Sequence, residues 1–226
     1  MTSPTPTFHL DSGTAQLSLH GQDRALVGRD LLLFGVFDGI GSLPQSGLAA
    51  ACAAAALTEA SRRAAGAGAA DPVAALIDGL QAAHRAIVAD RLGATTAVAV
   101  RLLPEAVAWA SVGDSRLYVK AGTEPLRQWT ADEGVGNRVD NWLGEGLPLP
   151  KARVDQAGVF AITLPLTLLL VTDGVTGDFA PDHLSPAELE AAVAGCSARE
   201  AAERLIRIAR KHDDRTAVVV RCTRPG

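Results

Sequence analysis

Three aspartates stand where apolar strands are expected to meet loops, and their carboxylates are candidate metal ligands. Asp38 and Asp173 each end an apolar run and precede a glycine, whereas Asp213 lies just before the last apolar run, residues 216–221. If the three strands lie side by side, the carboxylates come together, and such a cluster is too repulsive to stay ionised without cations. Hard oxygen ligands select Mg²⁺ or Mn²⁺ over Zn²⁺, which favours His or Cys.

Each Asp-Gly pair also has a simpler interpretation. Asp-Gly is among the commonest turn-forming pairs, so one pair taken alone indicates a turn and no more. The metal-site hypothesis therefore depends on the elements that carry the aspartates and on the residues around them.

The elements that position these residues are mostly strands. Apolar runs typical of strands occur at residues 14–19, 24–27, 31–37, 95–103, 106–112, 116–120, 159–163, 167–172 and 216–221. Two of the runs, 31–37 and 167–172, are apolar throughout, which indicates strands buried on both faces. Residues 95–103, 106–112 and 116–120 are expected to pair as a meander, with a turn at Pro104-Glu105 and a tight turn at Gly113-Asp114-Ser115.

Helices are expected in two pairs. The first pair comprises residues 44–65, which are rich in Ala and Leu, and a helix from Pro72 to about Arg91 with Asp71 as its N-cap. The second pair begins with a short helix after Ser185 and ends with a capped helix from Ser197 to about 211. Residues 123–150 are expected to be irregular, with a short turn of helix near 138–143.

This pattern predicts one domain, residues 1–226, of the α+β class. Strands outnumber helices and cluster in hairpins, so antiparallel sheets covered by two pairs of helices fit better than a parallel doubly wound sheet. A nucleotide-binding α/β fold has little support, because no Gly-rich loop follows a strand and opens a helix.

The bulk composition limits the partners. A formal net charge of -4 gives no electrostatic footprint for nucleic acid or an anionic membrane. The three cysteines are widely spaced, which suits neither a disulfide framework nor a zinc site. The longest apolar stretch, residues 47–57, is well below the about 20 residues of a membrane span. The first eight residues lack the pattern of a secretory signal, so a cytoplasmic location is expected.

Six short segments occur in an order that defines a family resemblance. They are Gly21-Gln22-Asp23-Arg24, residues 34–41 (FGVFDGIG), residues 93–97 (GATTA), residues 111–116 (SVGDSR), residues 168–175 (LLLVTDGV) and residues 213–220 (DDRTAVVV). Together they are far more specific than any one motif. The sequence resembles the bacterial members of the metal-dependent, type 2C serine/threonine protein phosphatases. The resemblance implies a four-layer αββα sandwich of two antiparallel sheets flanked by helix pairs, with a two-metal site at one edge.

The resemblance also implies metal ligands. Asp38 matches the carboxylate that bridges both Mn²⁺ or Mg²⁺ ions, and the Gly39 carbonyl matches a ligand of one of them. Asp173 and Asp213 then complete the coordination of the second ion. Asp114 matches a residue linked to a third, weaker ion, although Gly-Asp-Ser makes a good hairpin turn without any metal, so both interpretations remain open.

The implied reaction is hydrolysis of phosphoserine and phosphothreonine on proteins. The water shared by the two cations is acidified toward hydroxide and attacks phosphorus in line, and Asp23 matches the acidic residue beside this water. Asp38 and Asp23 are thus the expected catalytic residues. The implied partners are a phosphoprotein substrate and a bacterial Ser/Thr kinase that the enzyme opposes.

Three departures from the family pattern stand out. Residues 16–20 contain no Arg to grip the substrate phosphate; Arg24 or Arg29 could substitute, or both could be surface residues. Ile40 stands where relatives have His or Met, which leaves His212 as a weak candidate for assisting the leaving group. The flap segment within residues 123–150 is short.

The missing Arg and the short flap also support a second hypothesis. In this hypothesis the chain is a phosphoprotein-binding or sensing module of the same fold that has lost turnover.

Overall fold

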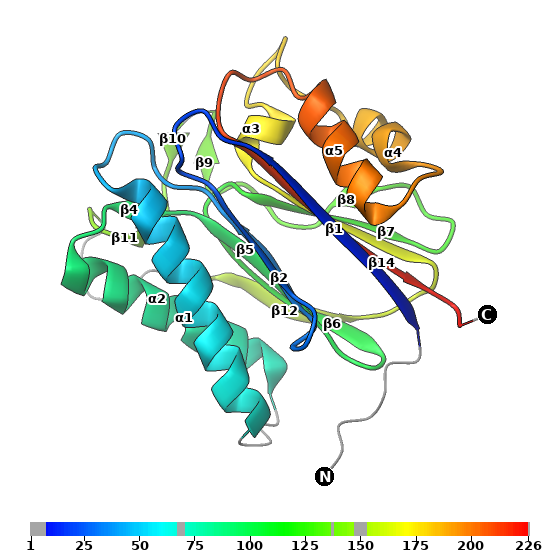
Figure 1. The fold of residues 1–226 in the computed structure, drawn as a ribbon, viewed down its shortest axis with the longest axis horizontal. Helices are drawn as coiled ribbons and strands as arrows, with labels where there is room; N and C mark the ends of the chain where they lie inside the picture. The colour runs from blue at the N-terminus through cyan, green and yellow to red at the C-terminus, as the bar shows by residue number, and fades with distance from the viewer. Residues whose placement is uncertain (1–7, 67–70, 137, 147–152, 226) are drawn as a thin grey trace.

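The computed structural model describes residues 8–66, 71–136, 138–146 and 153–225, which form two five-stranded antiparallel sheets (Figure 1). The first, called the β14 sheet, has the order β1 (His9–Leu17), β14 (Arg215–Thr223), β13 (Leu166–Val171), β7 (Arg116–Ala121) and β8 (Arg127–Gln128). The second, called the β3 sheet, has the order β12 (Gln156–Ala161), β6 (Ala106–Val112), β5 (Ala97–Leu102), β3 (Leu33–Phe37) and β2 (Arg24–Gly28).

Helix pairs cover the two outer faces, as Figure 1 shows. Helices α1 (Ser46–Gly66) and α2 (Pro72–Asp90) pack on the β3 sheet. Helices α4 (Pro186–Val193) and α5 (Ala198–Ile208) cover the β14 sheet, together with the single-turn helix α3 (Asp173–Thr176). The predicted four-layer αββα sandwich is confirmed.

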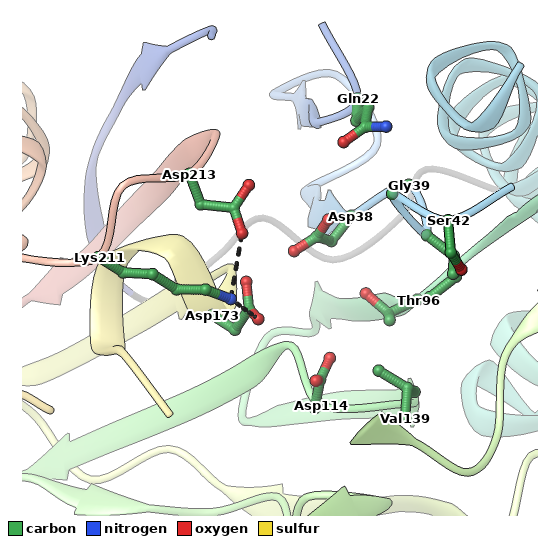
Figure 2. A pocket seen from close by; sticks show the side chains of 12 residues that line it. Gln22, Asp38, Gly39, Ser42, Thr96, Asp114, Val139, Asp173, Lys211 and Asp213 are labelled. Atoms are coloured by element: carbon green, nitrogen blue, oxygen red, sulfur yellow. Dashed lines mark hydrogen bonds and ion pairs between the residues drawn. The ribbon is translucent and has the colours of Figure 1, made fainter. Parts of the chain in front are cut away.

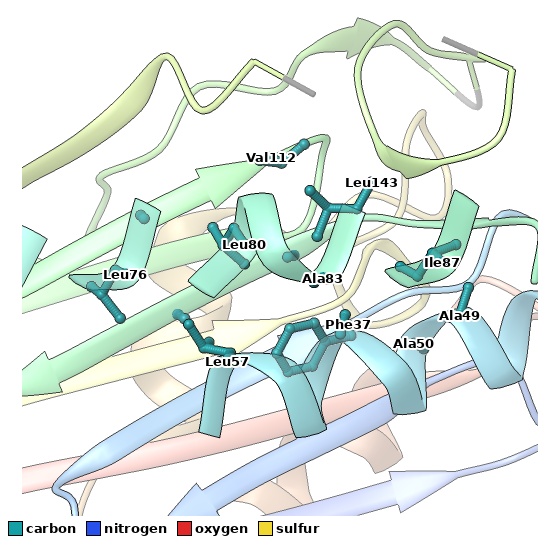
Figure 3. Close-up of a cluster of buried hydrophobic side chains, with 14 of the residues drawn as sticks. Phe37, Ala49, Ala50, Leu57, Leu76, Leu80, Ala83, Ile87, Val112 and Leu143 are labelled. Atoms are coloured by element: carbon teal, nitrogen blue, oxygen red, sulfur yellow. The ribbon is translucent and has the colours of Figure 1, made fainter. Parts of the chain in front are cut away.

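The apolar core has three layers because side chains of a strand alternate between its faces. On β3, Phe34 and Val36 face the other sheet, whereas Leu33 and Phe37 face the α1–α2 pair. Figure 3 shows Phe37 against Leu57 and neighbouring side chains of both helices. The prediction that 31–37 and 167–172 are buried on both faces is therefore confirmed, although β3 begins at Leu33 and β13 spans Leu166–Val171.

Local capping sets the helix ends. The side chain of Asp71 accepts hydrogen bonds from the Val73 and Ala74 N–H groups, with Pro72 at the first helical position, as predicted. Such a cap contributes about 1 kcal/mol. Ser197 and Glu200 form the predicted capping box of α5, but this helix ends at Ile208, before the predicted end near 211. The chain between α5 and β14 is thus an irregular segment, with bends at residues 211–213, that reaches the end of the sandwich.

The turn of helix predicted near residues 138–143 is wrong. Strand β10 (Arg138–Val139) pairs instead with β9 (Gly134–Val135), and β11 (Leu143–Gly144) pairs with β4 (Ala94–Thr95). The physical reason is that the backbone at both ends of this stretch pairs with other strands, Val139 with Gly134 and Leu143 with Thr95, which keeps it extended.

The meander predicted at residues 95–120 is confirmed in its first half, because β5 and β6 pair as a hairpin, and is wrong in its second half. Strand β6 belongs to the β3 sheet and β7 to the β14 sheet, so Gly113-Asp114-Ser115 carries the chain from one sheet to the other. Gly113 has φ 98°, a conformation that side chains strongly disfavour. The hairpin-turn interpretation of Asp114 is therefore excluded.

None of the helices within the described ranges combines the length and hydropathy of a membrane span.

Candidate active site

Four carboxylates surround one cavity of about 330 Å³ at an end of the sandwich (Figure 2). Asp38 directly follows β3, and Asp114 lies in the crossing between β6 and β7. Asp173 opens α3, two residues after β13 ends, and Asp213 lies two residues before β14. The complete lining is Gln22, Asp38, Gly39, Ile40, Gly41, Ser42, Thr96, Asp114, Val139, Asp173, Lys211 and Asp213. The structure thus brings together every residue predicted from the sequence as a metal ligand.

The carboxylates converge in a different way from the one predicted. Strands β13 and β14 are neighbours, but β3 lies in the facing sheet, so the three strands are not side by side. Asp173 and Asp213 come from the β14 sheet, whereas Asp38 reaches the cavity from the β3 sheet. The cavity therefore lies where the ends of the two sheets meet.

The backbone around Asp38 is held by several hydrogen bonds. Its carbonyl accepts from the Thr96 N–H at 2.8 Å and from the Thr95 hydroxyl at 2.9 Å. At Gly39, a Cβ atom would lie 2.7 Å from the Ser46 carbonyl carbon and oxygen, because α1 begins against this residue. Only glycine fits there, which is the structural reason for the Asp-Gly pair.

Burial and mutual repulsion disturb the titration of the cluster. Burial, followed by repulsion from Asp23, Asp173 and Asp114, raises the pKa of Asp38 well above its usual range. Burial and then repulsion from Asp173 raise the pKa of Asp114 to about 7, against the attraction of Lys211. Without cations, these carboxyls hold protons at pH values where exposed aspartates are ionised.

Asp23 lies behind the cavity and does not line it. Its side chain is fully buried, and its Oδ2 accepts a hydrogen bond of 2.9 Å from the Thr172 hydroxyl. Burial raises the pKa of Asp23 to about 7, although hydrogen bonding with neighbouring groups opposes the shift. Asp23 also contributes to the repulsion at Asp38, so it belongs to the same charge cluster.

Lys211 is a cavity residue that no motif in the sequence predicts. Its ammonium pairs with Asp173, with Asp178 at 3.0 Å and with Asp213 at 3.1 Å. Burial alone lowers the pKa of Lys211, but the attraction of Asp173 and the hydrogen bonds to Asp173 and Asp178 raise it overall, so the group stays charged. The one signal in the sequence was its position two residues before Asp213, which the predicted continuation of the helix to 211 obscured.

The sequence analysis also did not separate Asp214 from Asp213. Asp214 points away from the cavity and accepts hydrogen bonds from the N–H groups of Leu19, His20 and Gln22 at 2.5, 2.6 and 2.6 Å. Burial raises its pKa, but these N–H donors more than offset this, and the pKa is lowered overall. Asp214 therefore anchors the loop that carries Gln22 and the neighbouring Asp23.

The candidates for gripping phosphate do not reach the cavity. Arg24 donates to the carbonyls of Gly21 and Asp23, and Arg29 donates to Ser12. Within the described residues, no arginine lines the cavity. His212 is exposed and does not line it either, whereas Ile40 does.

The donor set suits a hard divalent cation, with one complication. Asp114 Oδ2 is buried without a hydrogen-bond partner, and four cavity carboxylates face a single ammonium. In the described part of the chain, however, no three His, Cys, Asp or Glu side chains are already arranged as a ligand set. The chemistry of these ligands therefore fits Mg²⁺ or Mn²⁺. Between Asp173 and Asp213, however, the structure has the Lys211 ammonium.

Fold and site together define a phosphatase-like α+β sandwich, and comparison with known proteins identifies the family. The catalytic domain of the serine/threonine protein phosphatase PstP, solved in complex with 2 manganese ions, matches with a TM-score of 0.77 and 20% identity, over 96% of this chain and 100% of that chain. PppA of Pseudomonas aeruginosa matches with a TM-score of 0.75 and 19% identity, over 95% and 98%. MsPP from Mycobacterium smegmatis, in complex with cacodylate, matches with a TM-score of 0.70 and 22% identity, over 97% of this chain and 100% of that chain.

The family model for protein phosphatase 2C matches residues 13–208, so the chain belongs to the protein phosphatase 2C family. This is a family of serine/threonine protein phosphatases. Among curated proteins, no sequence matches the chain.

Proposed function

We propose that this chain, as one catalytic domain, hydrolyses phosphoserine and phosphothreonine on proteins with the help of Mn²⁺ or Mg²⁺. The observation that carries the proposal is the convergence of Asp38, Asp114, Asp173 and Asp213 on one cavity from two different sheets. Carboxylates so costly to bring together are typical of a metal site. The physiological role we propose is opposition to a bacterial Ser/Thr kinase.

Each residue has a proposed task. Asp38 and the Gly39 carbonyl would hold one ion, and Asp38, Asp173 and Asp213 would hold the other. Asp114, whose Oδ2 is buried without a hydrogen-bond partner, would help to hold a third and weaker ion.

The chain's own residues prepare the site for the phosphate. The bound ions supply an activated water and positive charge beside the phosphoryl oxygens. Asp38 and Asp114 release their protons as cations bind, because the cations remove the repulsion that raises both pKa values. Ser42 and Gln22 offer polar side chains at the cavity wall, and Ile40 keeps one wall apolar.

The decisive test is metal-dependent turnover of the purified full chain. We expect phosphate release from a phosphothreonine peptide in Mn²⁺, its loss on chelation, and a fall of at least about 100-fold in Asp38→Asn. Asp155→Asn is the matched control, because Asp155 is exposed and pairs only with Arg153 among the described residues. No turnover in saturating Mn²⁺ with any phosphopeptide would refute the enzyme.

The binding or sensing module remains the second candidate function. It is favoured by two observations: no described arginine lines the cavity, and Lys211 already pairs with Asp173 and Asp213. This alternative predicts stable binding of a phosphorylated partner without phosphate release. Measuring binding and release on the same phosphoprotein separates the two functions.

A further inference from the structure

One side chain in the cavity has no place in the metal site proposed above. The Lys211 ammonium lies between Asp173 and Asp213, the two carboxylates assigned to the second ion, as the dashed lines in Figure 2 show. Its third partner is Asp178, which is not among the proposed ligands. An ammonium and a divalent ion cannot share these oxygens, so one of them must give way.

The Lys211 pairs are stronger than surface ion pairs. The side chains of Lys211, Asp173 and Asp178 are mostly buried, so salt and water screen their attraction only weakly. An ammonium has three donors, and three carboxylates take them up. No donor is left for a substrate phosphate, which argues against Lys211 as the missing phosphate grip.

The backbone at Lys211 is held independently of the ammonium. The Lys211 carbonyl accepts hydrogen bonds from the Arg215 guanidinium at 3.1 and 2.6 Å. Displacing the ammonium from Asp173 and Asp213 therefore does not require these backbone bonds to break, and the pair with Asp178 offers it another partner.

We propose that the Lys211 ammonium occupies the cation position between Asp173 and Asp213, and that a divalent ion binds there only by displacing this ammonium. The proposal rests on the metal site of the proposed function. It makes the two ion positions unequal: the ion on the Asp38 and Gly39 side meets no competitor, whereas the second ion binds weakly. The second ion, and with it full activity, then depends on the free Mn²⁺ concentration.

The test is Mn²⁺ binding itself, followed by electron paramagnetic resonance of the free ion with the metal-free full chain. We expect wild type to bind one ion tightly and a second weakly, and Lys211→Met to bind the second about tenfold or more tightly. Lys120→Met is the matched control, because Lys120 also pairs with a carboxylate, Glu190, outside the cavity. It should bind Mn²⁺ as wild type does.

Thermal unfolding gives a second readout. Lys211→Met leaves the carboxylates without their counter-ion, so its midpoint should fall in chelator and rise more than that of wild type when Mn²⁺ is added. If Lys211→Met does not fold without metal, Lys211→Gln, which keeps a hydrogen-bond donor but no charge, takes its place in both measurements.

The outcomes distinguish this inference from the function it rests on. Two ions bound with equal affinity by wild type and both Lys211 variants would overturn the inference and leave the proposed metal site intact. A higher KM for phosphopeptide with unchanged Mn²⁺ binding would also overturn it, in favour of a phosphate contact. Absence of Mn²⁺ binding in every variant would overturn both the inference and the proposed function.

Discussion

The hydroxyl of Thr172 donates to Asp23 Oδ2 at 2.9 Å, across 149 residues of chain, and its oxygen accepts from the Thr216 N–H at 3.0 Å. One buried side chain therefore ties the end of β13 to the start of β14 and to the residue that precedes β2. This contact sets the distance between the β14 sheet and the acidic group behind the cavity.

Replacing Thr172 by valine should destabilise the protein. Val keeps the shape but leaves Asp23 Oδ2 and the Thr216 N–H without this partner in a buried place, which costs about 1–3 kcal/mol. Urea unfolding measures the loss. Thr167→Val, near the other end of β13 and without a side-chain hydrogen bond of this kind, should change the free energy of unfolding by less than about 0.5 kcal/mol.

The stability of the metal-free protein should fall as the pH rises from about 4 to 7. Asp23 has a folded-state pKa of about 7 against 3.8 for the unfolded chain, so the folded protein binds more protons in this window. The stabilisation is complete below about pH 4 and is lost as the pH rises through the folded pKa. The loss is on the order of a few kcal/mol, to which Asp38 and Asp114 add with the same sign.

The measurement is the free energy of unfolding in chelator between pH 4 and 8. Asp23→Asn should make the curve less steep, because its amide does not titrate, whereas Asp38 and Asp114 still do. A wild-type curve that rises steadily over this range would contradict the assigned burial of Asp23.

Gly39→Ala should impair both folding and turnover. The added Cβ would lie 2.7 Å from the backbone of Ser46, so either α1 or the Gly39 carbonyl must shift, at a cost of about 1–3 kcal/mol. Gly41→Ala is the control, because its Cβ would meet only the Gln22 side chain at 3.5 Å. Equal effects of the two substitutions on unfolding and on phosphate release would show that the contact with α1 is not the cause.

Substitutions of the adjacent residues Asp213 and Asp214 should affect different properties, Mn²⁺ binding for Asp213 and the free energy of unfolding for Asp214. Asp213→Asn should weaken Mn²⁺ binding with little loss of stability, because its side chain faces the cavity. Asp214→Asn should lower the free energy of unfolding by about 1–3 kcal/mol, because one oxygen that accepts backbone N–H groups becomes an amide nitrogen. Calorimetric Mn²⁺ titration and urea unfolding of both variants would reveal any exchange of these roles.

Local signals in the sequence predicted much of this fold. Asp71 with Pro72 and Ser197 with Glu200 are capping patterns that neighbouring backbone atoms satisfy, so the sequence alone suffices to place the starts of α2 and α5. The candidate ligands were likewise found from their position at strand ends and from the family motifs.

Non-local packing decided the rest. A Gly-Asp-Ser link looks alike whether it closes a hairpin or crosses between sheets, and only the pairing of β6 and β7 with different partners distinguishes the two. The same holds for Lys211, whose three partners come from α3, the segment after it and the approach to β14. No periodicity in residues 209–214 indicates that a lysine there points inward.

Because the chain crosses between the sheets at Gly113-Asp114-Ser115, the spacing of the cavity carboxylates depends on how the β3 sheet and the β14 sheet are aligned. Asp38 is attached to the β3 sheet and Asp173 to the β14 sheet, whereas Asp114 lies in the link between the two sheets. Any sliding of one sheet over the other through the layer of Val100 and Leu168 changes the spacing of the carboxylates at once. Substitutions deep in that layer, far from the cavity, should therefore alter metal affinity before they unfold the protein.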